Sequence, residues 1–174
     1  AFTIAKATPD VETPTLETLI YEDGLTLFDE ALPSGWAWNE PTRAISVGTV
    51  SADATYTPSD TKNYNTVTRT LSFIVATAQG TVSITEDISK TYDGAPVDDP
   101  AVSQTGTGAV TYAYYAGTDT TATPLASAPT DAGTYTVVAT LAETEKYKGA
   151  RDSKSFEIRT APIVLGISAA QSGT

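Results

Sequence analysis

Three stretches of the chain alternate between apolar and polar residues with the two-residue period of a β-strand. They are residues 66–75, 110–115 and 134–140, and each is flanked by Gly, Pro, Asp or Ser. Alternation of this kind places every second side chain on one face of a sheet. No stretch of ten or more residues repeats its apolar positions with the period of a helix. The pattern therefore predicts an all-β chain of short strands, folded as a sandwich or a barrel.

The chain also resembles itself. Residues 2–7, 73–78 and 156–161 carry the same strand ending, a Phe followed by an alternating segment and a final Ala, at intervals of 71 and 83 residues. Shorter motifs recur in the same order inside both intervals. The matching motifs are Tyr21 to Gly24 with Tyr92 to Gly94, Gly48 and Thr49 with Gly133 and Thr134, and Asn63 and Tyr64 with Lys146 and Tyr147. A shared order of motifs at this spacing predicts a repeated module.

We therefore predict two β-sandwich modules in tandem, residues 8–77 and residues 78–161. Residues 1–7 are expected to be the last strand of a preceding repeat. Residues 162–174 are expected to be the start of a following repeat or a tail, with a first strand over residues 162–167. Because only a short segment joins the two modules, we expect the chain to be a monomer.

The side-chain chemistry of the chain is restricted. It has 10 Lys and Arg against 21 Asp and Glu, a net charge of -11, and no His, Cys or Met. A His-based triad, a thiol nucleophile and the usual zinc ligands are excluded, and an acidic chain is a poor partner for nucleic acid or an anionic membrane. No apolar run approaches the roughly 18 residues of a membrane-spanning helix. We expect no enzyme activity, no metal or cofactor, and no membrane insertion.

The run from Asp131 to Val137 resembles the D-x-G-x-Y-x-C signature of strand F in immunoglobulin domains, with Val137 where the Cys stands. The resemblance implies a structural role for Asp131, Gly133 and Tyr135. It implies that the Tyr135 ring is buried and that its hydroxyl is bonded to the backbone near residues 128–130.

The first module departs from this signature. Residues 47–50 keep the Gly but have neither the Asp nor the Tyr, and residues 54–56 are the candidate for a similar role. The signature also implies a large aromatic residue at the centre of strand C. The candidates for that position are Trp36 or Trp38 in the first module and Tyr112 or Tyr114 in the second.

Further motifs complete the series. In the first module they are residues 32–38, 47–49 and 57–64, and in the second they are residues 92–94, 112–115, 128–135 and 147–158. Taken in order, they resemble the tandem immunoglobulin-like repeats, of the MBG and YDG types, in surface proteins of Gram-positive bacteria. The resemblance implies an extracellular, cell-surface or cell-wall-associated module that presents or links adhesive or catalytic domains. It implies neighbouring repeats of the same chain as partners.

A carbohydrate-binding module is the alternative function. Trp36 and Trp38 are two residues apart, so on a strand they face the same side, where two indoles can stack on sugar rings. Tyr112, Tyr114 and Tyr115 form a second aromatic cluster. The candidate partners are host or dietary glycans, or host proteins. The opposing interpretation is that at least one of the two Trp residues fills the core.

Acidic pairs are candidate ligands for Ca²⁺, which prefers oxygen atoms. The pairs lie at residues 22–23, 86–87 and 98–99. None of them has the spacing of an EF-hand loop. Solvated carboxylates in turns are therefore the favoured interpretation.

Overall fold

The computed structural model describes residues 4–163. Within these residues the fold is all-β, as the alternation predicted, with one 3-10 turn and no helix long and apolar enough to span a membrane. The stretches predicted as strands form β4, β9 and β10, which confirms them. In chain order the elements are β1 (Leu19–Ile20), η1 (Leu27–Asp29), β2 (Trp36–Trp38), β3 (Gly48–Tyr56), β4 (Val67–Ala76), β5 (Ala78–Gln79), β6 (Thr81–Ile84), β7 (Lys90–Thr91), β8 (Val102–Thr105), β9 (Val110–Ala116), β10 (Gly133–Leu141), β11 (Tyr147–Lys148) and β12 (Ala150–Arg159).

The described chain forms two compact units. Unit 1 holds the residues up to Gly80 together with Glu143–Lys148, the segment that connects β10 to β12. Unit 2 holds Thr81–Ala142 and the residues from Gly149 onward. This division differs from the boundary placed after residue 77, because β11 pairs in parallel with β5 and so belongs to unit 1.

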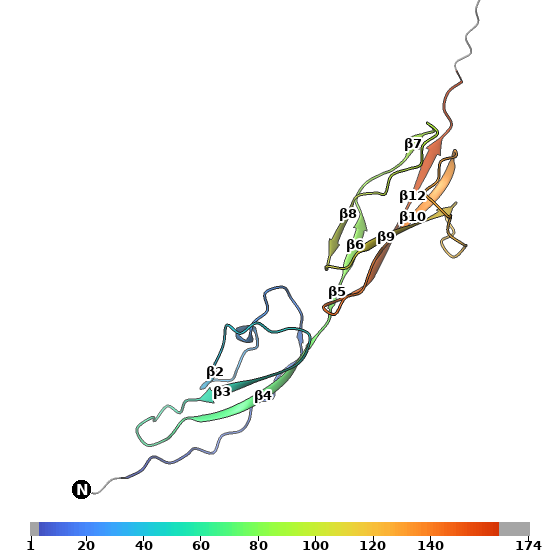
Figure 1. The fold of residues 1–174 in the computed structure, drawn as a ribbon. Coiled ribbons are helices and arrows are strands. Elements are labelled where there is room, and N and C mark those ends of the chain that lie inside the picture. The colour runs from blue at the N-terminus through green and yellow to red at the C-terminus, as the bar shows by residue number, and fades with distance from the viewer. Residues whose placement is uncertain (1–3, 164–174) are drawn as a thin grey trace, which may run out of the picture. The chain divides into compact units, whose positions relative to one another are not determined.

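Unit 1 is built on a four-stranded sheet in the order β1-β4-β3-β2 (Figure 1). β3 runs antiparallel to β4 and β2, whereas β1 runs parallel to β4. On β4, Leu71, Phe73 and Val75 are buried, and the residues between them are exposed. The two-residue period thus gives the sheet one apolar face and one face in water.

An irregular layer, rather than a second sheet, covers the apolar face of unit 1. Residues 25–28 are joined to residues 41–45 by backbone hydrogen bonds of 2.9 to 3.0 Å. The 3-10 turn η1 lies in this layer and buries Leu27. Leu27 shares one apolar core with Phe73 and Val75 of β4.

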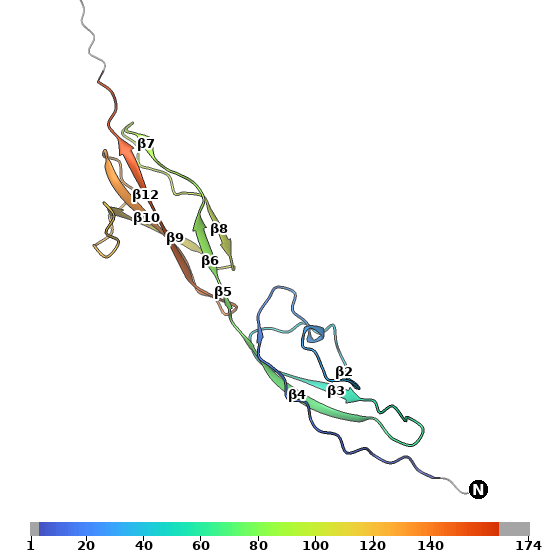
Figure 2. The same ribbon diagram turned by 180° about the vertical axis from the view of Figure 1, so that it is seen from behind.

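Unit 2 has a four-stranded sheet of the same kind, in the order β7-β12-β10-β9. β10 is antiparallel to β12 and β9, and β7 is parallel to β12. A second sheet, made of β6 and β8, packs against the first, with β6 in contact with β10 and β12 (Figure 2). The core between the sheets includes Val82, Ile84, Val137 and Phe156. Unit 2 is therefore sandwich-like.

The two four-stranded sheets also agree in register. In each sheet, the Gly that begins β3 or β10 faces the second residue after a Phe on the neighbouring long strand. The facing pairs are Gly48 with Val75 in unit 1 and Gly133 with Ile158 in unit 2, and the two Phe residues are Phe73 and Phe156. The Gly and Phe marks of the sequence therefore occupy corresponding positions in the two sheets.

The two predicted end strands lie at the limits of the described residues. Ala7 forms an isolated parallel bridge with Tyr64, and residues 4–6 form no strand. Residues 1–3 lie outside the described residues. The strand expected over residues 162–167 falls mostly on residues 164–174, which also lie outside them.

Candidate functional site: an aromatic groove in unit 1

A groove of about 470 Å³ opens in the irregular layer of unit 1. Its walls come from η1, the loop that follows η1, and β2. The lining residues are Phe28, Glu30, Ala31, Leu32, Trp36, Ala37, Trp38 and Pro41. A concave surface that is mostly apolar, with aromatic rings and one carboxyl group, has the composition of a small-ligand or sugar site.

The turn η1 brings Phe28 to the groove. At the start of the turn, Thr26 N and Thr26 Oγ1 donate hydrogen bonds to Asp29 Oδ2 at 2.7 and 3.0 Å, which closes a capping box. These hydrogen bonds lower the pKa of the Asp29 carboxyl below its ordinary value. The turn points Leu27 inward and leaves Phe28 77% exposed. An apolar ring this open is a candidate contact surface.

Trp38 belongs to the core beneath the groove. Its ring lies 6.0 Å from the Phe73 ring, and its Nε1 donates a hydrogen bond to Glu30 O at 2.9 Å. Only 8% of the residue is exposed. Both the apolar surface and the polar atom of the indole are therefore already used inside the fold.

Trp36 is half-buried and packs beside Tyr56, with the two ring centroids 5.7 Å apart. Gly35 allows this approach, because its φ is +87° and a Cβ there would lie 2.6 Å from Tyr56 Cε2. Both Trp36 and Trp38 line the groove. The sequence offered Tyr56 as a candidate for the tyrosine-corner role. In unit 2 that role belongs to Tyr135, which faces Phe156, and the residue that faces the corresponding Phe73 in unit 1 is Val50. Tyr56 lies at the opposite end of β3 from Val50.

Glu30 is one of the lining residues, and only 5% of it is exposed. Burial raises the pKa of the Glu30 carboxyl above its ordinary value. A hydrogen bond from the Glu17 backbone partly opposes the rise, and the negative charge of Glu17 adds to it. The Glu30 carboxyl is therefore desolvated and already accepts a hydrogen bond within unit 1.

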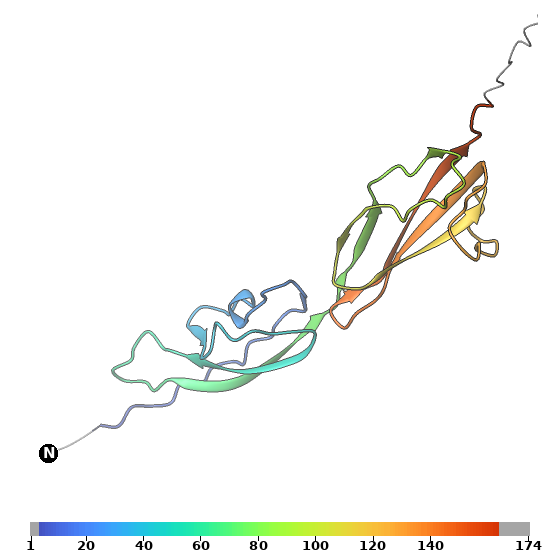
Figure 3. The same ribbon diagram turned by 45° about the horizontal axis from the view of Figure 1, so that its top comes forward.

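The Tyr cluster of β9 is used inside unit 2. Tyr112 OH donates to Pro100 O at 2.9 Å, and Tyr114 OH donates to Asp99 Oδ1 at 2.7 Å. Tyr114 and Tyr115 are buried and Tyr112 is half-buried, in a region where the connection from β9 to β10 runs beside β9 (Figure 3). Burial raises the pKa of the Tyr114 hydroxyl, so it remains a donor. These rings therefore do not form the open ligand surface considered from the sequence.

Tyr135 forms a tyrosine corner that differs in two details from the expectation. Its hydroxyl donates to Asp131 O at 3.0 Å, rather than to the backbone of residues 128–130, and its ring is half-buried rather than buried. The ring stacks on Phe156 with centroids 5.8 Å apart. Gly133 leaves room for it, since a Cβ there would lie 3.3 Å from the ring. Because the acceptor is at the surface, water competes for this hydrogen bond.

Each acidic pair has a carboxylate that accepts a hydrogen bond within its own unit. Asp23 Oδ1 accepts from Tyr21 OH at 3.0 Å, and Glu86 Oε2 accepts from Ala101 N at 2.9 Å. The third pair supplies Asp99, the acceptor for the Tyr114 hydroxyl. Over residues 4–163, no group of three or more acidic side chains is placed to hold a metal ion.

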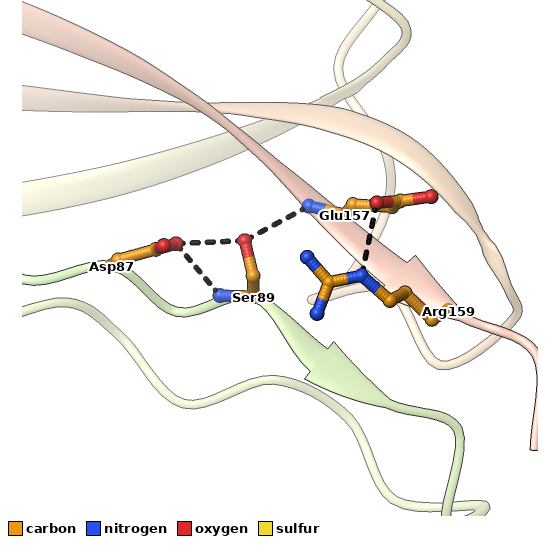
Figure 4. Close-up of polar contacts among 4 residues, drawn as sticks. All are labelled: Asp87, Ser89, Glu157 and Arg159. Carbon is orange, nitrogen blue, oxygen red and sulfur yellow. Dashed lines mark hydrogen bonds and ion pairs between the residues drawn. The ribbon is translucent and has the colours of Figure 1, made fainter.

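Asp87 belongs to a polar cluster that fastens the segment before β7 to β12 (Figure 4). Asp87 Oδ1 accepts from Ser89 N at 3.0 Å and from Ser89 Oγ at 2.7 Å, and Ser89 Oγ accepts from Glu157 N at 3.2 Å. Glu157 Oε2 pairs with Arg159 Nε at 3.2 Å. The hydrogen bonds from Ser89 lower the pKa of the Asp87 carboxyl. The cluster extends the pairing of β7 with β12 and is structural.

Phe28 and Glu30 are the aromatic and charged groove residues that the sequence did not single out. The available signal was the capping pattern of Thr26 and Asp29, which marks a turn but does not say which side of the turn faces water. Glu30 carries no local signal, because its burial depends on the packing of Trp38 against the same loop.

No protein-family model matches this chain, and no curated protein matches it. The assignment of a function therefore depends on the residues and contacts described above. Those contacts support one structural function and one binding function, which are taken in turn.

Proposed function

We propose that this chain consists of two tandem immunoglobulin-like modules of an extracellular bacterial surface protein. The modules act as a structural spacer that presents or links other domains, and the chain is not an enzyme. Its location is the cell surface or the cell wall, and its partners are neighbouring repeats of the same chain. The chain acts as a monomer without metal or cofactor.

The observation that carries this proposal is the repeated sheet. The orders β1-β4-β3-β2 and β7-β12-β10-β9 correspond strand by strand, with the same parallel edge pair and the same antiparallel central pairs. The repeated Gly and Phe residues stand at corresponding positions in both sheets. Two copies of one sheet in one chain favour a module used for its architecture.

The use of polar groups supports the same function. Tyr112, Tyr114 and Tyr135 donate their hydroxyls to acceptors within unit 2, and each acidic pair has a carboxylate that accepts a hydrogen bond within its own unit. In the polar cleft of unit 1, Arg43 Nη2 donates to Ser51 O at 2.8 Å. Side chains engaged in this way stabilise the fold and are not held ready for a substrate.

A display experiment tests the spacer function. The full chain is inserted between a cell-wall anchor and an epitope tag on a Gram-positive cell. A spacer acts through its fold and length, so an unrelated tandem β-sandwich of equal length should give equal antibody access to the tag, and deletion of the chain should lower that access. Adhesion or polysaccharide cleavage that the unrelated sandwich does not reproduce would contradict the proposal.

Carbohydrate binding is the second candidate function, and the observation that favours it is the exposure of Phe28 beside Trp36 in one groove. The exposed Phe28 ring and the half-buried Trp36 ring, in a mostly apolar groove, fit the apolar ring faces of a neutral sugar. Trp36, rather than Trp38, is the candidate platform, since Trp38 is a core residue.

Two substitutions test the groove on a glycan array. Trp36→Ala and Phe28→Ala should each abolish any glycan retention of the full chain. Ile74→Ala, at an exposed position on β4 away from the groove lining, is the matched control and should leave retention unchanged. Retention that survives both groove substitutions would exclude the groove as the binding site.

A further inference from the structure

In unit 1, the side chains of Tyr21 and Tyr147 pack against each other. The Tyr21 ring lies 5.7 Å from the Tyr147 ring, edge to face at 89°, and Lys146 Nζ stands 4.9 Å from the centre of the Tyr21 ring. Tyr21 OH donates to Asp23 Oδ1 at 3.0 Å. Tyr21 is 5% exposed and Tyr147 is 6% exposed. Edge-to-face packing and a cation over a ring are both favourable, so this is a built contact.

Backbone pairing holds Tyr147 in this place. Ala78 lies opposite Tyr147 in the parallel pair of β5 and β11, and Ala78 N donates to the carbonyl of the residue before Tyr147 at 2.9 Å. Ala7 is placed on Tyr64 in the same way, by a parallel bridge in which Ala7 N donates to the carbonyl of the residue before Tyr64 at 2.8 Å. Tyr64 therefore corresponds to Tyr147.

Tyr92 occupies in unit 2 the position that Tyr21 occupies in unit 1. Each Tyr directly follows a two-residue strand that runs parallel to the long strand beside it. The backbone N–H of each donates to a carbonyl of that long strand, at 2.9 Å for Tyr21 and 2.7 Å for Tyr92. Ala161 stands in the same relation to Tyr92 as Ala78 does to Tyr21.

The exposure of the four Tyr residues separates them into two pairs. Tyr21 and Tyr147, which meet, are almost fully buried, whereas Tyr92 is 43% exposed and Tyr64 is 42% exposed. Ala161 is exposed, whereas its counterpart Ala78 is 8% exposed. Unit 2 thus has the counterparts of Tyr21 and Ala78, namely Tyr92 and Ala161, and both are exposed.

We propose that Tyr92 and Ala161 form a docking site for the Tyr-bearing loop of another repeat of this class. The loop Tyr packs edge-on against the Tyr92 ring, and the loop backbone pairs with Ala161. Asp93, which follows Tyr92, pairs with Lys90 at 2.7 Å, so the ring of Tyr92 and the backbone of Ala161 are the groups that receive the loop. The inference rests on the proposed function, because its occupant is a neighbouring repeat.

A duplicated chain tests the docking site. Residues 1–161 are joined directly to a second copy of residues 8–174, so that Ala161 precedes Thr8 as Ala7 does in the single chain. Tyr92 of the first copy can then meet Tyr64 of the second copy. Tyr92 of the second copy is an internal control with the same surroundings and no following loop. A Thr118→Ser substitution marks the first copy for mass spectrometry.

Nitration of Tyr side chains is the readout, since reactivity follows exposure. In the single chain, Tyr92 and Tyr64 should react at least about fivefold faster than Tyr21 and Tyr147, in line with their exposed fractions. In the duplicated chain, Tyr92 of the first copy should slow to the rate of Tyr21, and Tyr92 of the second copy should keep its rate. Equal rates for the two Tyr92 residues would overturn the proposal.

Two variants of the duplicated chain sharpen the result. Tyr64→Ala in the second copy alone should restore fast nitration of Tyr92 in the first copy, whereas Phe28→Ala, which removes another exposed ring, should not. Protection that persists in the Tyr64→Ala variant would also overturn the proposal. Failure here leaves the display experiment on the single chain unaffected, so the docking site and the spacer function can fail separately.

Discussion

The two units share a sheet and differ in what covers it. In unit 2 a second sheet, β6 and β8, lies against β10 and β12. In unit 1 the corresponding face is covered by the 3-10 turn η1 and the loops around it. The groove with its open aromatic surface occurs in the irregular layer. The two units therefore share the architecture of the sheet and differ in the side chains of the layer that covers it.

In each unit, an aromatic residue of the last strand in the sheet order links the sheet to the layer that covers it, and in unit 2 Tyr112 adds a further link through Pro100 O. Trp38 of β2 packs against Phe73 and donates to Glu30 O in the cover. Tyr114 of β9 packs edge to face against Phe156, with centroids 6.2 Å apart, and donates to Asp99 in the cover. These two links are the points at which substitutions should separate the sheet from its cover.

Trp38→Ala should have the largest effect. Removing a buried indole leaves a cavity and an unpaired Glu30 carbonyl, which should lower the free energy of unfolding of unit 1 by about 3 to 5 kcal/mol. Chemical denaturation followed by NMR signals from each unit measures this. Val137 and Ile158 signals, which report on unit 2, serve as the control, and an equal loss of stability in both units would contradict the separation of the two cores.

Tyr114→Phe should break the matching link of unit 2. The hydroxyl donates to a carboxylate in a partly buried site, so its loss should cost about 1.5 to 3 kcal/mol, confined to unit 2. The same denaturation experiment measures it. A neutral substitution would show that the hydrogen bond to Asp99 does not hold the cover of unit 2 in place.

Tyr135→Phe should cost less, about 0.5 to 1 kcal/mol. Its acceptor, Asp131 O, lies in an exposed turn, so water replaces the lost hydrogen bond in part. Differential scanning calorimetry of the variant beside Tyr114→Phe gives the comparison. A cost above that of Tyr114→Phe would mean that the corner is more deeply buried than described.

Glu30→Gln should produce a small, pH-dependent effect. Burial raises the folded-state pKa of Glu30, so the unfolded state ionises first as the pH rises, and the wild-type chain should lose stability relative to the variant over the pH interval in which this carboxyl titrates. Urea denaturation of both proteins across this interval measures the difference. A relative gain by the wild type with rising pH would reverse the assignment.

Part of this account was predictable from local sequence, and part was not. The alternation in β4, β9 and β10 indicated the central strands, and the repeated Gly and Phe marks indicated their correspondence. β2 has only three residues, and η1 is a single turn, so neither carries enough periodicity to be identified. The cover of unit 1 depends on which loops pack together, which no local pattern encodes.

The segment Glu143–Lys148 illustrates the same limit. Lys146 and Tyr147 match Asn63 and Tyr64 in the sequence, but this match does not predict which residues they contact. Their role comes from the parallel pairing of β11 with β5 and from the burial of Tyr147 against Tyr21. Pairing between segments so far apart in the chain leaves no local trace.

Native-state hydrogen exchange of backbone amides tests the central comparison most directly. The account predicts strong and similar protection in β3 and β4 of unit 1 and in β10 and β12 of unit 2. It predicts protection in β6 at Ser83, which faces Ser103 in the ladder with β8, and at Ile84, whose N–H donates to Asp152 Oδ2 at 2.7 Å. In the cover of unit 1 it predicts protection only at hydrogen-bonded amides such as Leu27 and Phe28. Unprotected amides at Ser83 and Ile84, or uniform protection through the loops around η1, would contradict the claim that one sheet carries two different covers.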